Sequence, residues 1–357
     1  RASLLTGRLP IRNGFYQTNI DGRNSYTPQE IVGGIPDSEI LLHLGHQSQY
    51  LPLKHGFHHQ FGSTNCHFGP YDNVSTPNIP DFVIDRTTGE SNLTRMYTEE
   101  AVNFIQGRQN QENPFFMLWT PDSTHAPTFA SQDFLHTSRR KTYGAATREL
   151  DAGVGSILAA LDEVGLTNNT FVVFTSDNGP ALVSKFDGGS NGPFLCGKQT
   201  TFEGGMRAPG IFYWPGTIPA GTTTHQVWTH MDLFSTLLEL AGIDLPDDRF
   251  IDGLPLSRSL DDPDLEFLRP VLLPRNRLMA VRLGSYKMHL WTWNTTPEEL
   301  EELLAAVEEH EAELVAGEPQ LNWCDRAVMH WSPPGCEEIG QCLTVPESNP
   351  YLCDWPH

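Results

Sequence analysis

Asp177 and Asn178 are the first residues in this chain whose type and position suggest chemistry. They follow the apolar run 171–174, whose β-branched and aromatic residues predict a strand covered on both faces. Ligands bind at the carboxyl ends of strands in open α/β sheets, and carboxylate and carboxamide oxygens suit Ca²⁺ or Mg²⁺ better than Zn²⁺. Because Asp-Asn-Gly is also a strong turn signal, these residues alone leave a metal site and a simple turn both open.

Two more side chains that could take part in a reaction lie near other predicted strand ends or loops. His125 sits in the polar segment after the apolar run 115–119, and Lys198 sits in a glycine-rich excursion between residues 188 and 205. Histidine can transfer protons near neutral pH, and lysine supplies a positive charge for an anion. Long loops without regular structure usually serve a function. Both residues could still be ordinary solvated side chains.

The elements that must position these residues alternate along the chain. Helical periodicity over 93–106 and 150–164 alternates with apolar runs at 115–119 and 171–175, and a third apolar run follows at 211–214. This order predicts an α/β fold, with a mostly parallel sheet flanked by helices.

The sequence changes character after about residue 265. A hairpin is predicted around Gly284-Ser285, followed by an acidic helix over 297–315 and a cysteine-rich tail. We therefore expect an N-terminal α/β domain over residues 1–265 and a smaller C-terminal α+β domain over residues 266–357.

Charge excludes several classes of partner. The chain has 44 acidic and 23 basic residues, which gives a formal net charge of −21. A field of this sign repels nucleic acids and anionic membrane surfaces, so an anionic substrate needs a local cation. Protonation of the 14 histidines would cut the net charge to about a third, which favours an acidic compartment. No apolar run approaches the length of a transmembrane helix.

Cysteines and glycosylation sequons indicate the secretory pathway. Four of six cysteines crowd the tail, where loop lengths favour the nested pairs Cys324–Cys353 and Cys336–Cys342. The pairing of Cys66 and Cys196 stays open. Asparagine sequons, each weak by itself, occur at Asn73, Asn92, Asn168 and Asn294.

Several motifs, taken in order, resemble the sulfatases of the alkaline-phosphatase-like superfamily. The family signature is Cys-x-Pro-Ser-Arg followed by a short helix that ends in Thr-Gly-Arg, and the chain begins on the arginine of that signature. The resemblance covers nearly the whole chain. The matching segments are Arg1-Ala-Ser-Leu-Leu-Thr-Gly-Arg8, His43-Leu-Gly, Thr124-His-Ala-Pro127, Thr175-Ser-Asp-Asn-Gly179 and Gly197-Lys-Gln-Thr-Thr-Phe-Glu-Gly-Gly205.

The resemblance implies a sulfuric ester hydrolase and assigns its residues. Asp177 and Asn178 would hold one Ca²⁺, and His125 and Lys198 would contact the sulfate, one of them protonating the leaving oxygen. A formylglycine, made from a cysteine upstream of Arg1, would supply the hydroxyl nucleophile. Arg1 would orient that group and His43 would take the proton that drives sulfate release.

The resemblance also implies a substrate and a location. The substrate would be the 6-sulfate of N-acetylgalactosamine or galactose units in glycosaminoglycans of the keratan sulfate and chondroitin 6-sulfate type. The protein would reach the lysosome through the secretory pathway, and a homodimer is possible.

The sequence departs from the family pattern at several points. The nucleophile and the upstream aspartate pair of the calcium site are absent, and Leu42 abuts His43 where relatives have Gly-Lys-Trp. A second gap falls between Trp293 and Glu298. We therefore expect an incomplete or exon-skipped sulfatase chain, with no turnover by this polypeptide alone.

Two alternatives stay open. One is a phosphoester hydrolase of the same superfamily, although Lys198 stands where a second metal would need a ligand. The other is a catalytically dead secreted glycoprotein with the same fold.

Overall fold

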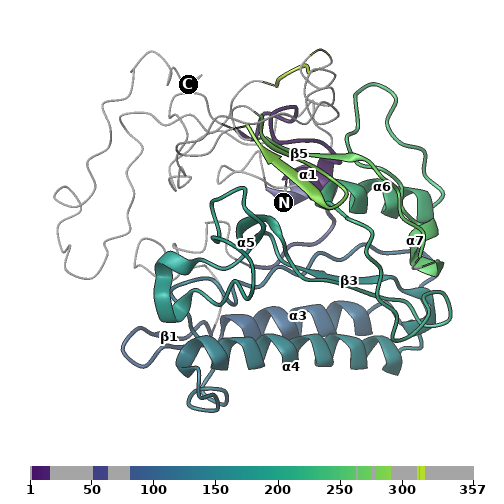
Figure 1. The fold of residues 1–357 in the computed structure, drawn as a ribbon. Coiled ribbons are helices and arrows are strands. Elements are labelled where there is room, and N and C mark those ends of the chain that lie inside the picture. The colour runs from purple at the N-terminus through teal and green to yellow at the C-terminus, as the bar shows by residue number, and fades with distance from the viewer. Residues whose placement is uncertain are drawn as a thin grey trace, which may run out of the picture. The chain divides into compact units, whose positions relative to one another are not determined.

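The computed structural model describes residues 2–16, 51–62, 81–262, 264–274, 278–290, 312 and 314–317. The chain divides into two compact units, one of Phe61–Ile218 and one of Arg1–Gln60 with Pro219–His357 (Figure 1). Arg1, His43 and the cysteine-rich tail lie outside the described residues, and so does nearly all of the predicted acidic helix. The domain boundary near residue 265 stays a prediction.

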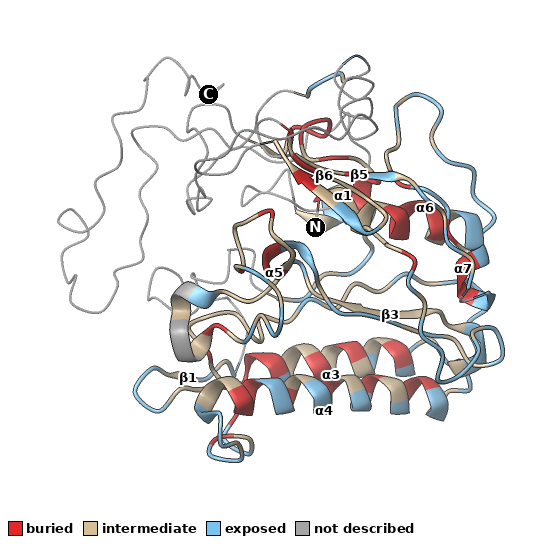
Figure 2. Cartoon of the chain, viewed as in Figure 1, coloured by how far each residue is buried: buried red, intermediate tan, exposed pale blue. Residues whose placement is uncertain are grey.

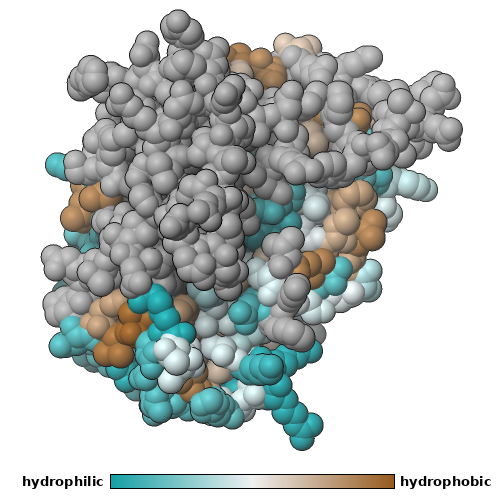
Figure 3. All heavy atoms as spheres, turned by 90° about the vertical axis from the view of Figure 1, so that its left-hand side faces the viewer, coloured by the Kyte–Doolittle hydropathy of each residue, from teal (hydrophilic) through white to brown (hydrophobic). Residues whose placement is uncertain are grey.

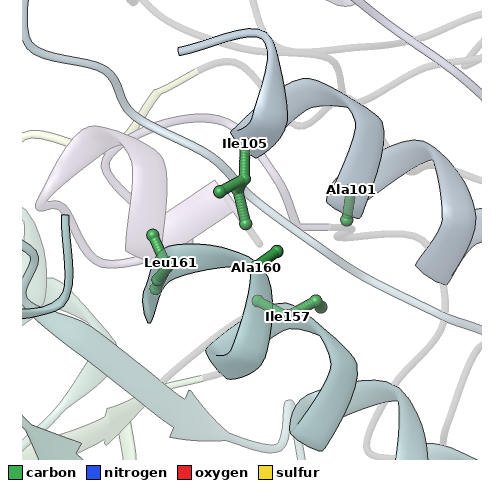
Figure 4. Close-up of a cluster of buried hydrophobic side chains, with 5 residues drawn as sticks. All are labelled: Ala101, Ile105, Ile157, Ala160 and Leu161. Atoms are coloured by element: carbon green, nitrogen blue, oxygen red, sulfur yellow. The ribbon is translucent and has the colours of Figure 1, made fainter. Parts of the chain in front are cut away.

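Two long helices form the core of the unit Phe61–Ile218. They are α3 (Leu93–Gln106) and α4 (Lys141–Glu163), which confirms the helices predicted from the periodicity of residues 93–106 and 150–164. Figure 2 shows buried residues along both helices, with exposed residues on their other faces. Because each helix has one apolar face, burial against the other removes both faces from water. Their contact is formed by Ala101, Ile105, Ile157, Ala160 and Leu161 (Figure 4).

The predicted strands at 171–175 and 211–214 are present as β3 (Val172–Thr175) and β4 (Gly210–Tyr213), but they run antiparallel. The register pairs Val172 with Tyr213 and Thr175 with Gly210. The predicted parallel arrangement is therefore wrong for this pair. A parallel return needs a crossover, usually a helix, whereas the described chain between β3 and β4 has only the 3₁₀ helix η4 (Leu182–Asp187) and the four-residue α5 (Glu203–Met206).

Two further predictions about this sheet need correction. Residues 115–119 are not assigned to a strand; Phe115, Met117 and Trp119 instead pack against the α3–α4 core. Strand β4 is not buried, since Ile211 is 59% and Tyr213 41% exposed. Within the described residues β4 pairs only with β3, so its side chains lack a second neighbouring strand.

A short ribbon precedes α3. Strands β1 (Ile84–Asp85) and β2 (Glu90–Ser91) pair antiparallel around a turn in which Asp85 accepts hydrogen bonds from Thr87 and Thr88. Glu90 also forms an isolated parallel bridge with Ala130. The ribbon thus connects the start of α3 to the chain that follows His125.

The second unit is organised around α6 (His230–Leu240). Thr229 and Asp232 form a capping box at its start. The short α1 (Ala2–Thr6) packs against α6, and its last turn ends at Gly7, whose φ is +67°. Two more short helices belong to this unit, the 3₁₀ helix η2 (Pro52–Lys54) and α7 (Arg258–Asp261).

Asp252 fixes the chain that follows α1. Its carboxylate accepts a hydrogen bond from the Leu9 amide at 2.9 Å and pairs with the Arg12 guanidinium at 3.0 Å. Both side chains of the ion pair are buried, and Arg12 also lies over the Phe250 ring. Buried charges persist only when paired in this way, so the turn after α1 is held in one conformation.

The predicted hairpin around Gly284-Ser285 is confirmed. Strands β6 (Leu278–Leu283) and β7 (Tyr286–His289) pair antiparallel, and β5 (Pro270–Pro274) pairs with the other edge of β6. Leu278, Val281 and Met288 form the buried side of this three-stranded sheet.

The surface mixes polar and apolar groups. Figure 3 shows hydrophobic patches beside hydrophilic ones on one face. The most exposed large apolar side chains include Leu268 at 75% and Tyr286 at 70%. None of the described helices combines the length and apolar character needed to cross a membrane.

Glu149 is a buried carboxylate on α4, only 3% exposed. It accepts hydrogen bonds from the Ser131 amide at 2.8 Å and the Ser131 hydroxyl at 2.5 Å. Burial raises the pKa of Glu149 above its ordinary value of 4.5, although the Ser131 hydrogen bonds and the charge of Arg95 act in the opposite direction.

We expect Glu149 to make the fold more stable at acidic pH. A raised folded-state pKa gives a stabilising contribution that is complete below the ordinary value of 4.5 and lost as pH rises through the folded-state pKa. In Glu149→Gln the carboxamide can accept from the Ser131 amide and donate to its hydroxyl. The difference in unfolding free energy, wild type minus Glu149→Gln, should therefore grow as pH falls from about 7 to about 4.5 in urea titrations. A difference that stays constant with pH would contradict this expectation.

Candidate functional site

The four site residues predicted within the described chain all lie in the unit Phe61–Ile218. His125 belongs to the loop after residues 115–119, Asp177 and Asn178 follow β3, and Lys198 lies in the excursion between β3 and β4. The other two predicted site residues, Arg1 and His43, lie outside the described residues.

The loop that carries His125 is tied to both long helices. The hydroxyl groups of Thr94, on α3, and Ser123 lie 2.8 Å apart and share a hydrogen bond. On the other side of His125, Ser131 is bound by Glu149 of α4. Within the loop, the His125 amide donates to the Asp122 carbonyl at 2.8 Å. These contacts limit the positions that the imidazole can take.

His125 and Lys198 are in direct contact, although 73 positions separate them in the sequence. The Lys198 Nζ atom lies 2.9 Å from His125 Nε2, and His125 Nδ1 lies 2.6 Å from the Ala126 carbonyl oxygen. Because a carbonyl oxygen only accepts hydrogen bonds, Nδ1 carries the proton in this arrangement. Nε2 then offers its lone pair to the lysine ammonium, so a neutral imidazole lies beside a charged lysine.

The backbone of the lysine segment is anchored to the end of β3. The Lys198 amide donates to the Pro180 carbonyl at 2.8 Å, and the Gly179 amide donates to the Gly205 carbonyl at 2.9 Å. Lys198 is therefore fixed next to the residues that directly follow Asp177 and Asn178. His125 joins the same group through its contact with Lys198.

Close backbone approach explains the glycines of this segment. A Cβ atom on Gly179 would lie 1.9 Å from the Gly204 carbonyl oxygen, and one on Gly204 would lie 2.1 Å from the Cys196 carbonyl oxygen. Both distances are far below van der Waals contact. Only glycine allows the backbone segments at residues 179, 196 and 204 to lie this close. Packing as well as chemistry therefore dictates the sequence of the segment.

Asp177 and Asn178 offer oxygen atoms that suit a hard cation. Asp177 is exposed and Asn178 half-buried, and neither side chain forms a hydrogen bond with another described residue. Ca²⁺ takes six to eight oxygen ligands, and these two side chains fit that chemistry as part of a shell. Across the described ranges, no cluster of three or more histidine, cysteine, aspartate or glutamate residues could hold a metal.

A shallow hollow lies beside His125. It is lined by residues 122–125 and 127–129 of the histidine loop and by Ala146 of α4. Cys196, whose pairing was left open, is half-buried with a φ of +60°, and it forms no disulfide within the part of the chain that the structure describes. Cys66 and the four tail cysteines lie outside the described residues.

Glu149 and Asp187 support the site but were not identified from the sequence. Asp187 accepts a hydrogen bond from Thr128 at 3.0 Å and so connects η4 to the histidine loop. Glu149 could have been recognised from the sequence as a buried residue, because Ala145 and Gly153 lie four residues before and after it on the buried face of α4. A carboxylate at that position of a helix requires a hydrogen-bonding partner. No comparable local pattern marks Asp187.

Comparison with known proteins supports one family. The family model described as Sulfatase matches residues 1–243. N-acetylgalactosamine-6-sulfatase from Mus musculus is 49% identical over 442 aligned positions, covering 100% of this chain and 85% of the relative. The protein of that name from Homo sapiens is 47% identical, with 100% and 84% covered. Arylsulfatase A from Bos taurus is 34% identical, with 82% and 65% covered.

The alignment with the mouse protein is longer than the chain itself, 442 positions against 357 residues. The relative therefore has internal segments without a counterpart here. This agrees with the prediction that the chain departs from the family by internal gaps.

Solved structures agree on the fold. Ps i-CgsB in complex with k-i-k-neocarrahexaose matches with a TM-score of 0.67 and 25% identity, covering 89% of this chain and 82% of the other. The PsFucS1 sulfatase from Pseudoalteromonas sp. matches with a TM-score of 0.64 and 26% identity, with 83% and 68% covered. Sequence and fold agree: this chain belongs to the sulfatase family, whose members share an alkaline-phosphatase-like α/β fold and hydrolyse sulfate esters.

Proposed function

We propose that this protein removes the 6-sulfate from N-acetylgalactosamine or galactose units of glycosaminoglycans, as in keratan sulfate and chondroitin 6-sulfate. The observation that carries the sulfate chemistry is the contact between Lys198 and His125, fixed beside the Asp177-Asn178 end of β3. The sugar and the sulfate position are inferred from relatives named N-acetylgalactosamine-6-sulfatase, which align with the whole chain.

Lys198 provides the local cation that an anionic substrate needs in a protein of net charge −21. Its ammonium group has three N–H donors, so it can bind sulfate oxygens while it stays close to His125. Held by backbone hydrogen bonds rather than by a flexible loop alone, this charge is positioned before the substrate arrives. Such preorganised charge stabilises the negative charge that develops during ester cleavage.

His125 is placed to transfer a proton. With Nδ1 bonded to the Ala126 carbonyl, the unprotonated Nε2 is the ring atom that meets Lys198, so it can take a proton from the lysine ammonium and pass it to the leaving oxygen. We propose that His125 and Lys198 both contact the sulfate and that one of them protonates the leaving sugar oxygen. Proton transfer of this kind typically contributes about 100- to 10,000-fold to a rate.

Asp177 and Asn178 would hold one Ca²⁺, for which Mg²⁺ is the less suitable substitute. When bound, the ion supplies positive charge to the sulfate oxygens. A formylglycine would supply the hydroxyl nucleophile, with Arg1 orienting it and His43 accepting its proton. The carboxylate of Asp177 and the carboxamide of Asn178 fit the oxygen preference of Ca²⁺.

The same proposal includes a location and an assembly. The cysteine-rich tail, for which disulfides are predicted, the sequons and the negative charge relieved by histidine protonation support passage through the secretory pathway to the lysosome. We further propose a homodimer, and we keep the domain limits 1–265 and 266–357 as a proposal.

The first test is substrate discrimination by the protein expressed from its full coding sequence. We expect release of inorganic sulfate from 6-sulfated N-acetylgalactosamine and galactose, and much slower release from the 4-sulfated sugars. Ion chromatography would measure the product, with galactose 6-phosphate as the matched phosphoester. Faster release of phosphate would instead support the phosphoester hydrolase alternative, and a folded protein without any turnover would support a catalytically dead glycoprotein.

The second test removes the lysine charge. We expect Lys198→Met to lower kcat/KM by about 100- to 1,000-fold and to weaken inhibition by inorganic sulfate, because the preorganised charge is lost. Lys198→Arg keeps the charge but changes its geometry, and should fall between wild type and Lys198→Met. Lys54→Met, an equal change at an exposed lysine, is the control. Unchanged sulfate inhibition in Lys198→Met would contradict the assigned contact.

The third test concerns the metal and does not depend on activity. Because a ligand that binds only the folded state stabilises it by about 2.7 kcal/mol at 100 times its Kd, Ca²⁺ should raise the melting temperature. Asp177→Ala should abolish this shift, while Asp151→Ala, at an exposed position of α4, should preserve it. An equal Ca²⁺ shift in both variants would show that Asp177 is not a ligand.

A further inference from the structure

We propose that Asn168 carries an N-linked glycan, at the end of β3 opposite to the catalytic residues. This inference rests on the secretory location proposed above. It goes beyond the proposed function because it selects one modification site from geometry, and sulfate chemistry does not require it.

The local conformation makes Asn168 accessible. The sequon Asn168-Asn169-Thr170 has no proline at its middle position. Asn168 and Asn169 are exposed in the 3₁₀ helix η3 (Thr167–Asn169), which connects α4 to β3. Among the described residues, the Asn168 carboxamide has no hydrogen-bond partner, so its nitrogen is available for attachment without loss of a structural contact.

The backbone around the sequon is held in place while the side chain points to solvent. The Trp214 indole N–H donates to the Asn168 carbonyl at 3.0 Å, and the Thr170 hydroxyl donates to the Leu166 carbonyl at 2.8 Å. The first bond ties the turn to the residue that follows β4, and the second ties it to the chain that follows α4. A glycan at Asn168 would therefore project from a defined position.

Aromatic side chains next to the sequon would stabilise the first sugars of the glycan by packing against them. The ring of Phe171 lies 5.8 Å from that of Trp214 and 5.7 Å from that of Phe212, measured between centroids. Phe171, Phe212 and Trp214 are all half-buried. The apolar face of a sugar ring packs on such aromatic surface, and a glycan there would cover apolar groups at the edge of the β3–β4 ribbon.

The position leaves the proposed active site open. Asn168 precedes β3, whereas Asp177 and Asn178 follow it. A strand rises about 3.3 Å per residue, so the four residues of β3 with their flanking residues separate the two ends by roughly 20 Å. We expect a glycan at Asn168 to affect solubility without obstructing the residues that bind sulfate.

The attachment reaction is a group transfer from a lipid-linked oligosaccharide diphosphate. The Asn168 carboxamide nitrogen forms a bond to C1 of the terminal N-acetylglucosamine and loses one proton. The bond from C1 to the diphosphate oxygen breaks, and the lipid diphosphate leaves with the electron pair. No oxidation or reduction takes place.

The experiment maps occupancy residue by residue in protein secreted from eukaryotic cells. Glycosidase release in heavy-oxygen water converts each occupied asparagine to a labelled aspartate, which peptide mass spectrometry locates. We expect label at Asn168 in wild type and in the matched control Asn169→Gln, which keeps the sequon. Asn168→Gln and Asn169→Pro should each lose one glycan on a gel, and Asn168→Gln should retain wild-type kcat/KM.

The outcomes separate this inference from the proposed function. Label at other sequons with none at Asn168 would overturn the inference and leave the secretory route intact. No label at any sequon of the secreted protein would also overturn the inference, whereas failure of the protein to enter the secretory pathway would overturn the secretory location on which the inference rests. A properly secreted Asn168→Gln with greatly reduced kcat/KM would overturn the placement of the glycan away from the active site. The wild-type peptide map decides occupancy even if a variant fails to fold.

Discussion

Backbone contact between Gly179 and Gly204 is the constraint on which the described site depends. It brings the end of β3 against the segment that carries Lys198, at a distance that no side chain larger than hydrogen allows. Two backbone hydrogen bonds, from Gly179 to Gly205 and from Lys198 to Pro180, are formed as a result. The main chain thereby fixes the backbone of Lys198, and the side chain places the ammonium group within hydrogen-bond distance of His125.

Electrostatics explains why this contact suits a sulfate ester. The protein as a whole repels anions, so binding depends on a small region in which positive charge is concentrated. Lys198 supplies that charge next to a histidine whose proton is held on Nδ1. The histidine loop is in turn fixed through Ser131 by a buried carboxylate, Glu149, whose pKa is raised by burial. Acidic conditions should therefore stabilise the scaffold of the same loop.

Sequence periodicity was sufficient for most elements, although residues 115–119 did not form the predicted strand, and it was insufficient for the direction in which β3 and β4 pair. Helices α3 and α4, strands β3 and β4, and the β6–β7 hairpin were all predicted, because each depends on the local spacing of apolar residues. The direction of β4 relative to β3 was predicted wrongly. Strand direction depends on how the intervening chain returns, and the described chain between them has no crossover helix of sufficient length.

The sequence by itself determined the family and four chemically capable residues in the described chain, His125, Lys198, Asp177 and Asn178, because short motifs preserve the residue types that the chemistry needs. Only the tertiary structure decided that His125 and Lys198 touch, which ring nitrogen carries the proton, and that Glu149 and Asp187 support the loop. Three of these contacts join residues 18 to 73 positions apart, and the fourth, between His125 Nδ1 and the Ala126 carbonyl, depends on the conformation of the loop. They arise from packing and backbone approach, of which the local pattern of residues could mark only Glu149, as a carboxylate on the buried face of α4.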